Sequence, residues 1–137
     1  MTFSASVGFA TPIASGTANV NGAFTAVTKS FKIKHQREEG KSLIYGVLEG
    51  PEHAVYARGK LTDSNIIILP EEWEWLVDMD SVTVQLTPIG SHQKLYVKSI
   101  DNFTITVGNE NLFNSNVNCY YIVHATRKDV PNLITVE

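Results

Sequence analysis

The side chains that could carry out chemistry are few in this sequence and lie far apart. None of its histidines forms a closely spaced pair with another histidine or with a cysteine, which is the spacing that most zinc sites use. The only cysteine lies in the apolar run 117–125, so we expect a small buried side chain rather than a reactive thiol. We therefore predict neither a metal site nor a cofactor. The residues concerned are His35, His53, His92, His124 and Cys119.

The densest polar cluster surrounds the dipeptide Gly50-Pro51. Glu49, Glu52 and His53 flank it, and Arg58 follows. Two carboxylates and a histidine have the groups needed for acid–base catalysis, and glycosidases use paired carboxylates. A rigid turn between two strands accounts equally for the Gly-Pro centre and leaves the charges in solvent or at a subunit contact. We favour the turn and predict no catalytic residues.

Two tryptophans, Trp73 and Trp75, stand two positions apart between acidic residues. If exposed, they and nearby tyrosines such as Tyr56 would offer flat apolar faces for stacking sugar rings. If buried, they would close the end of a hydrophobic core. Of these two interpretations we favour partial burial.

Composition excludes several classes of function. The chain has 137 residues, is 43% hydrophobic and 18% charged, and has a net charge of −3, so it lacks the basic excess that nucleic-acid binding requires. No apolar run approaches the roughly 18 residues of a membrane span, and the first residues do not resemble a signal peptide. We expect neither nucleic-acid binding nor membrane insertion, and we expect synthesis in the cytoplasm.

Residues 1–28 differ sharply from the remainder. They contain no charged residue and consist mostly of Gly, Ala, Ser and Thr, so they cannot form a core alone. Large apolar residues are nevertheless spaced along the segment. They suggest an extended arm that docks on another subunit, although a free terminus is the alternative. The candidate anchoring residues are Phe3, Phe9, Ile13 and Phe24.

From residue 29 to residue 137 the pattern is that of a β domain. Apolar and polar residues alternate in 31–35, 54–61, 82–87, 102–107 and 117–126, and turn residues separate these runs. Residues 42–49 are apolar on both faces, which predicts a central strand, and 66–69 predict a short buried one. Residues 70–77 form the one helical candidate, and Leu133 and Val136 suggest a terminal strand. The sequence thus predicts a compact all-β, antiparallel sandwich or barrel-like domain preceded by an extended arm.

The β region also resembles a known family. The strings that carry the resemblance occur in order over nearly four fifths of the chain. They are residues 30–35 (SFKIKH), 46–59 (GVLEGPEHAVYARG), 68–70 (ILP), Trp73, 76–78 (LVD), 82–90 (VTVQLTPIG), 93–97 (QKLYV), 117–121 (VNCYY) and 125–130 (ATRKDV). They are similar to the C-terminal module of tail-fibre and other virion structural proteins of tailed bacteriophages, notably T4-like phages and marine cyanophages.

The resemblance implies a non-enzymatic virion component: a small tail fibre, a tip, an adaptor or a surface decoration protein. It also implies a homotrimer that contacts other virion proteins, and it brings no catalytic residues. In the look-alikes this module usually ends a much longer chain, whereas only a short arm precedes it here. Two alternatives remain, a host-recognition module that binds surface glycans and, less favoured, a hydrolase or lyase that acts on polysaccharide.

The arm hypothesis predicts the behaviour of a truncated chain. A variant that starts at Lys29 should still fold, because the predicted strands all lie downstream. It should be lost from phage particles or form a weaker oligomer, because each large apolar side chain buried by the arm would contribute roughly 1.5–3 kcal/mol. Quantitative blotting of purified particles measures its occupancy. Incorporation at the wild-type level would exclude the anchoring role.

Overall fold

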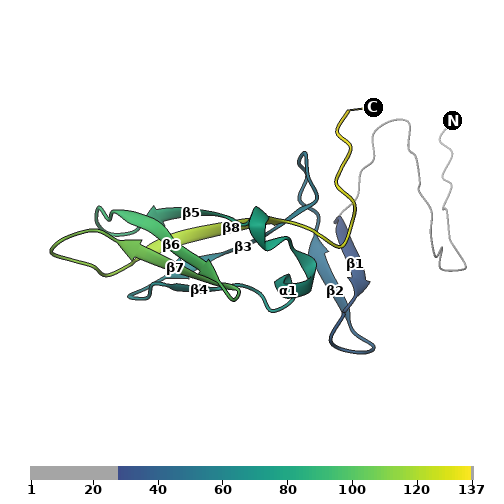
Figure 1. Cartoon of the computed structure of the whole chain (residues 1–137), viewed down its shortest axis with the longest axis horizontal. Coiled ribbons are helices and arrows are strands. Elements are labelled where there is room, and N and C mark those ends of the chain that lie inside the picture. Colours follow the sequence, from purple (N-terminus) through teal and green to yellow (C-terminus); the bar gives the residue numbers. More distant parts are fainter. Residues whose placement is uncertain (1–27, 137) are drawn as a thin grey trace, which may run out of the picture.

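The computed structural model describes residues 28–136, which form eight strands and two short helical segments. Three antiparallel sheets are present: two of three strands each, and one two-stranded hairpin beside them (Figure 1). This arrangement confirms the predicted all-β sandwich-like domain. The proposed anchoring residues Phe3, Phe9, Ile13 and Phe24 lie outside the described residues.

The first large sheet has the order β3-β8-β5. It consists of β3 (Ala54–Leu61), β8 (Cys119–Thr126) and β5 (Thr83–Pro88). The longest predicted alternation becomes the central strand β8, in which Cys119, Val123 and Ala125 are buried. Cys119 is therefore a core residue, as predicted, and burial raises the pKa of its thiol.

The second large sheet has the order β4-β7-β6. It consists of β4 (Ile66–Ile68), β7 (Thr104–Asn109) and β6 (Leu95–Asp101), with a register irregularity between Val97 and Ser99. A two-residue turn joins β6 to β7, and both of its residues, Asn102 and Phe103, have positive φ. The backbone twist of such a turn matches the right-handed twist of the two strands that it joins.

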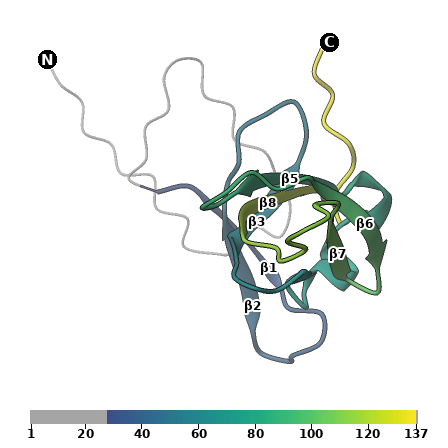
Figure 2. The same cartoon turned by 90° about the vertical axis from the view of Figure 1, so that its left-hand side faces the viewer.

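One hydrophobic core lies between the two large sheets. Viewed along the long axis, the sheets curve around it, and β5 approaches β6 (Figure 2). The inward side chains alternate along each strand, as a pleated strand requires. They are joined at one end of the sandwich by residues of the helical segment. The fully buried members of this core are Ile67, Trp73, Leu76, Val77, Ile105, Val107, Cys119 and Val123.

The helical prediction for 70–77 is confirmed in a shorter form. The α1 helix (Trp73–Leu76) is followed by the 3-10 turn η1 (Met79–Ser81). Pro70 lies before the helix and accepts a hydrogen bond from the Trp73 amide at 3.0 Å. The segment is held at both ends: the Leu69 amide donates to the Phe103 carbonyl, and the Asp78 amide donates to that of Thr126.

Three strand predictions were wrong. The run 42–49 is not central: β2 (Ser42–Gly46) pairs only with β1 (Ser30–Lys34) in a separate hairpin, and its outward residue Ile44 is 57% exposed. In β4 only Ile67 is buried, because one face of this sheet packs on the core and the other faces solvent. Leu133 and Val136 form no strand. The first two cases show that an apolar run does not require cover on both faces of a strand.

A cross-strand Gly–Tyr pair gives a stability prediction. Gly59 on β3 lies opposite Tyr121 on β8, and a Cβ at Gly59 would lie only 2.6 Å from Tyr121 Cζ. Gly59→Ala should therefore lower the free energy of unfolding by about 1–3 kcal/mol, because the half-buried ring must move out of its packed position.

Gly46→Ala is the matched control, since a Cβ there meets no atom within 4 Å. It should be neutral, or stabilising by up to about 1 kcal/mol through lower entropy of the unfolded chain. Urea denaturation of both variants measures the difference. Equal stability of the two variants would show that the Tyr121 ring does not constrain Gly59.

Candidate functional site

The structure separates the three aromatic residues that were proposed to contact a glycan. Trp73 has no exposed surface, and Trp75 is half-buried with its ring edge against His35 at a centroid distance of 5.6 Å. The indole Nε1 of both is buried and has no hydrogen-bond partner. The two indoles therefore form no stacking surface, and burial is complete for Trp73. Only Tyr56, 48% exposed on β3, remains available for contact.

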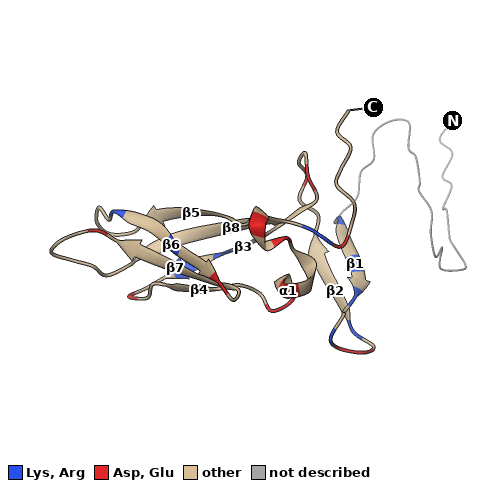
Figure 3. Ribbon diagram, in the orientation of Figure 1, with Lys and Arg blue, Asp and Glu red and all other residues tan. Residues whose placement is uncertain are grey.

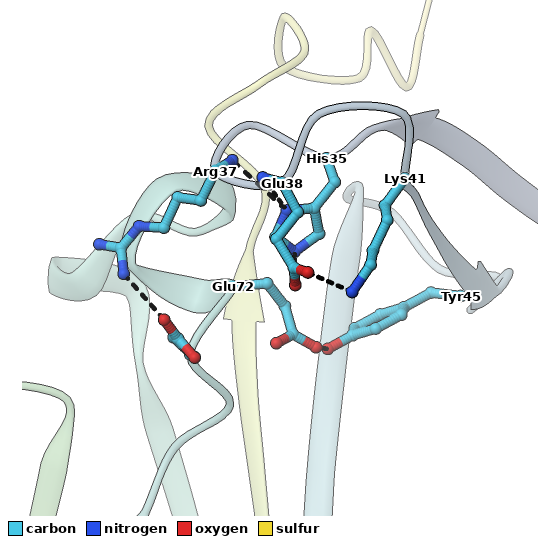
Figure 4. Close-up of polar contacts among 7 residues, drawn as sticks. His35, Arg37, Glu38, Lys41, Tyr45 and Glu72 are labelled. Carbon is cyan, nitrogen blue, oxygen red and sulfur yellow. Dashed lines mark hydrogen bonds and ion pairs between the residues drawn. The ribbon is translucent and has the colours of Figure 1, made fainter.

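A polar junction connects the β1–β2 hairpin to the α1 segment. The Tyr45 hydroxyl donates a hydrogen bond of 2.6 Å to Glu72 Oε1 (Figure 4). Burial raises the pKa of Tyr45 well above its usual value, and the neighbouring Glu72 carboxylate raises it further. The phenol is therefore held in its neutral, donating form, which suits a structural contact.

Exposed ion pairs surround this hydrogen bond. Arg37, in the hairpin loop, contacts Glu71 Oε1 at 3.1 Å and also pairs with Glu74. Within the loop, Lys41 pairs with Glu38 and lowers the pKa of that carboxyl group. Exposed pairs of this kind contribute little, typically below about 1 kcal/mol each. They orient the hairpin loop more than they stabilise the fold.

A nearly buried cation completes the junction from the other side. The Arg127 guanidinium lies 3.9 Å from the centre of the Phe31 ring, the geometry of a cation–π contact. Two of its nitrogens also donate to the Asp129 carboxylate, at 2.8 and 2.6 Å. The segment after β8 thereby holds β1, so the hairpin is attached to the domain by three different contacts.

The predicted polar cluster around Gly50-Pro51 is dispersed by its hydrogen bonds. Glu49 pairs with Lys29, whereas Glu52 accepts a hydrogen bond of 2.7 Å from Thr126 Oγ1. Glu52 and His53 do line a depression of about 360 Å³ together with Asp78. Asp78, however, caps η1 by accepting from the Asp80 amide. These carboxylates serve structural contacts, and Arg58 points to a different part of the surface.

No three His, Cys, Asp or Glu side chains within residues 28–136 lie close enough together to hold a metal ion. Among the helices described for this chain, none is long and apolar enough to span a membrane.

Another depression, larger than the one beside Glu52, lies on the outer face of β3-β8-β5. It has a volume of about 500 Å³. The alternation in the sequence indicates that each strand has two different faces, but it does not indicate which strands lie side by side. The residues that line it are Arg58, Gly59, Lys60, Gln85, Thr87, Tyr120, Tyr121 and Ile122.

A second surface, which we call the apolar groove, lies between the hairpin and β3. It has a volume of about 370 Å³ and is lined by Ile44, Tyr45, Gly46, Val47, Leu48, Val55 and Tyr56. The four most exposed large side chains in it are Ile44, Val47, Leu48 and Tyr56. Within residues 28–136, three apolar side chains of the run 42–49 thus stay exposed: Ile44, Val47 and Leu48.

Comparisons of this chain with protein-family models, with curated proteins and with solved structures find no match.

The junction generates a prediction for Tyr45. Tyr45→Phe should lower the free energy of unfolding by about 0.5–1.5 kcal/mol, because the Glu72 carboxylate loses a hydrogen-bond donor. Tyr56→Phe is the control, since Tyr56 is exposed, and it should change stability by less than about 0.5 kcal/mol.

The same contact predicts a dependence on pH. The pKa of Tyr45 is higher in the folded chain than in the unfolded chain, where it is about 10, so this contribution is complete below pH 10 and is lost as pH rises above it. The wild-type protein should therefore lose more stability than Tyr45→Phe above pH 10. Denaturant titrations at pH 8 and pH 11 measure this, and parallel losses in the two proteins would contradict it.

Proposed function

We propose that this chain is a non-enzymatic structural protein of a tailed-bacteriophage virion, which assembles as a homotrimer and is anchored through residues 1–28. The resemblance of residues 30–137 to virion structural modules supports the virion role and the trimer. An all-β sandwich with short turns is compatible with both. The proposal also places residues of the apolar groove at the contact between copies.

The observation that carries the assembly part is the exposure of the apolar groove. Ile44 is 57% exposed, Val47 47%, Tyr56 48% and Leu48 37%, and all four line one depression. Scattered apolar side chains are normal on a surface, whereas a contiguous group is typical of an interaction site. The central part of subunit interfaces is depleted of charge and enriched in tyrosine, as this groove is.

The position of the groove suits a second copy of this chain as its occupant. The Val47 amide donates to the Lys29 carbonyl at 3.2 Å, so residues 1–28 join the domain directly beside the groove. In the assembly that we propose, the body contact and the point where the arm joins the domain therefore lie on one side of each subunit. The arrangement leaves the far end of the sandwich free to face outward.

The experiment is a pair of surface variants. The double change Ile44→Asp and Val47→Asp places charges in the groove and should convert the oligomer to a monomer at micromolar concentration, because a desolvated carboxylate without a partner is costly to bury. Sedimentation equilibrium measures the mass. Ile68→Asp is the control. Ile68 is 78% exposed on the β4-β7-β6 sheet, so this substitution should leave the oligomer intact.

Three outcomes would contradict the proposal. A wild-type monomer at the same concentration would exclude the trimer, and dissociation by Ile68→Asp alone would place the contact on the other sheet. Absence of the wild-type chain from purified particles of the phage that encodes it would exclude the virion role.

A further inference from the structure

The outer face of the β3-β8-β5 sheet carries a site that the proposed function does not use. The strand register aligns two rows of side chains across this sheet. In the first row, Lys60 lies opposite Tyr120, and Tyr120 lies opposite Thr87. In the second, Arg58 lies opposite Ile122, and Ile122 lies opposite Gln85. The two rows are adjacent because alternate residues of each strand face the same side.

The charged side chains on this face are all basic. None of the residues of β3, β5 and β8 is an Asp or a Glu, although the chain as a whole is acidic. Figure 3 accordingly shows no red on these three strands. Among the described residues, Arg58 and Lys60 take part in no ion pair, whereas Arg37 and Arg127 do. Two cations therefore lie side by side, and no carboxylate of residues 28–136 pairs with either of them.

The face also forms a depression, which is lined by both polar and apolar side chains. The two rows line the depression of about 500 Å³, which is within the range of small-ligand sites, roughly 300–1,000 Å³. The exposed Tyr120 ring offers a flat apolar surface of the kind on which the apolar face of a sugar ring can stack. Gln85 and Thr87 supply the amide and hydroxyl groups that hydrogen-bond sugar hydroxyls. Arg58 and Lys60 supply donors suited to a carboxylate.

We propose that this face binds an acidic oligosaccharide, with the carboxylate of a sugar acid on Arg58 and Lys60 and a neighbouring ring on Tyr120. The site differs from the tryptophan platform excluded above, since Trp73 is in the core. A nucleic acid fits the face less well. Its affinity comes from many phosphate contacts, and only two cations are present on a chain of net charge −3. The proposal does not depend on the virion role or on the trimer.

Isothermal titration with an acidic and a neutral α-1,4-linked trisaccharide tests the proposal. The acidic probe is the α-1,4-linked trimer of galacturonic acid, and the neutral probe is maltotriose. The full-length protein should bind the acidic trimer at least about tenfold more tightly than the neutral one. The difference should shrink as salt is raised from 50 to 300 mM, since ions screen an exposed charge contact.

Variants assign the binding to this face. Arg58→Gln and Lys60→Gln should each weaken binding of the acidic trimer by about tenfold while leaving the weak binding of maltotriose unchanged. Tyr120→Ala should weaken binding of both sugars, because it removes the stacking surface. Lys98→Gln is the matched control. It removes a lysine from β6 in the other large sheet, so it should bind like the wild type.

Several results would overturn the proposal. These are no binding of the acidic trimer, equal binding of the two sugars, or wild-type binding by both Arg58→Gln and Lys60→Gln in proteins that unfold at the wild-type denaturant midpoint. Tighter binding of a single-stranded oligonucleotide than of the sugar, lost in the same variants, would instead assign the face to nucleic acid. Each of these readouts is independent of particle incorporation and of oligomer mass.

Discussion

The packing of the α1 segment against the end of the sandwich is the constraint on which the other parts depend. Trp73, Leu76 and Val77 have no exposed surface and complete the core where the two large sheets end. The backbone around them is bonded to both sheets, through Leu69 to the β4-β7-β6 sheet and through Asp78 to β8. The side chain of Glu72 then holds Tyr45 of the hairpin. One short segment thus links all three sheets.

This arrangement explains why the hairpin is a separate sheet with an exposed side. Its inward residues, including Leu43, join the core beside α1, and Arg127 covers Phe31 from the segment after β8. Its outward residue Ile44 is 57% exposed, since no layer formed by residues 28–136 covers it. Since the hairpin is attached at one end of the sandwich, the apolar groove forms where the hairpin meets β3. A hairpin that continued the sheet of β3 would leave no groove there.

The two large sheets use their outer faces differently. On β3-β8-β5 the outward positions hold cations, tyrosine and amide or hydroxyl groups, without acids. On β4-β7-β6 they include Ile66, Ile68 and Asp101. A Gly–Tyr pair occurs in each sheet, Gly59 with Tyr121 and Gly108 with Tyr96, and in both the ring lies over the glycine. In both sheets the tyrosine ring fills the space left by the missing side chain of glycine. Because the sheets share this feature, the difference between their outer faces comes from the outward-facing residues.

The sequence by itself determined the class of fold, the two-residue alternation of most strands, the burial of Cys119 and the helical turn near Trp73. All of these follow from local patterns, because a pleated strand sends successive side chains to opposite faces. Only the tertiary structure decided that Trp73 is in the core, that Ile44 on the outer face of the hairpin is exposed whereas Leu43 is buried, and that Lys60, Tyr120 and Thr87 form one row. The physical reason is that pairing and cover are non-local. Alternation states that a residue shares a face with its second neighbour, but which strand lies beside it, and whether another layer covers it, depends on residues tens of positions away.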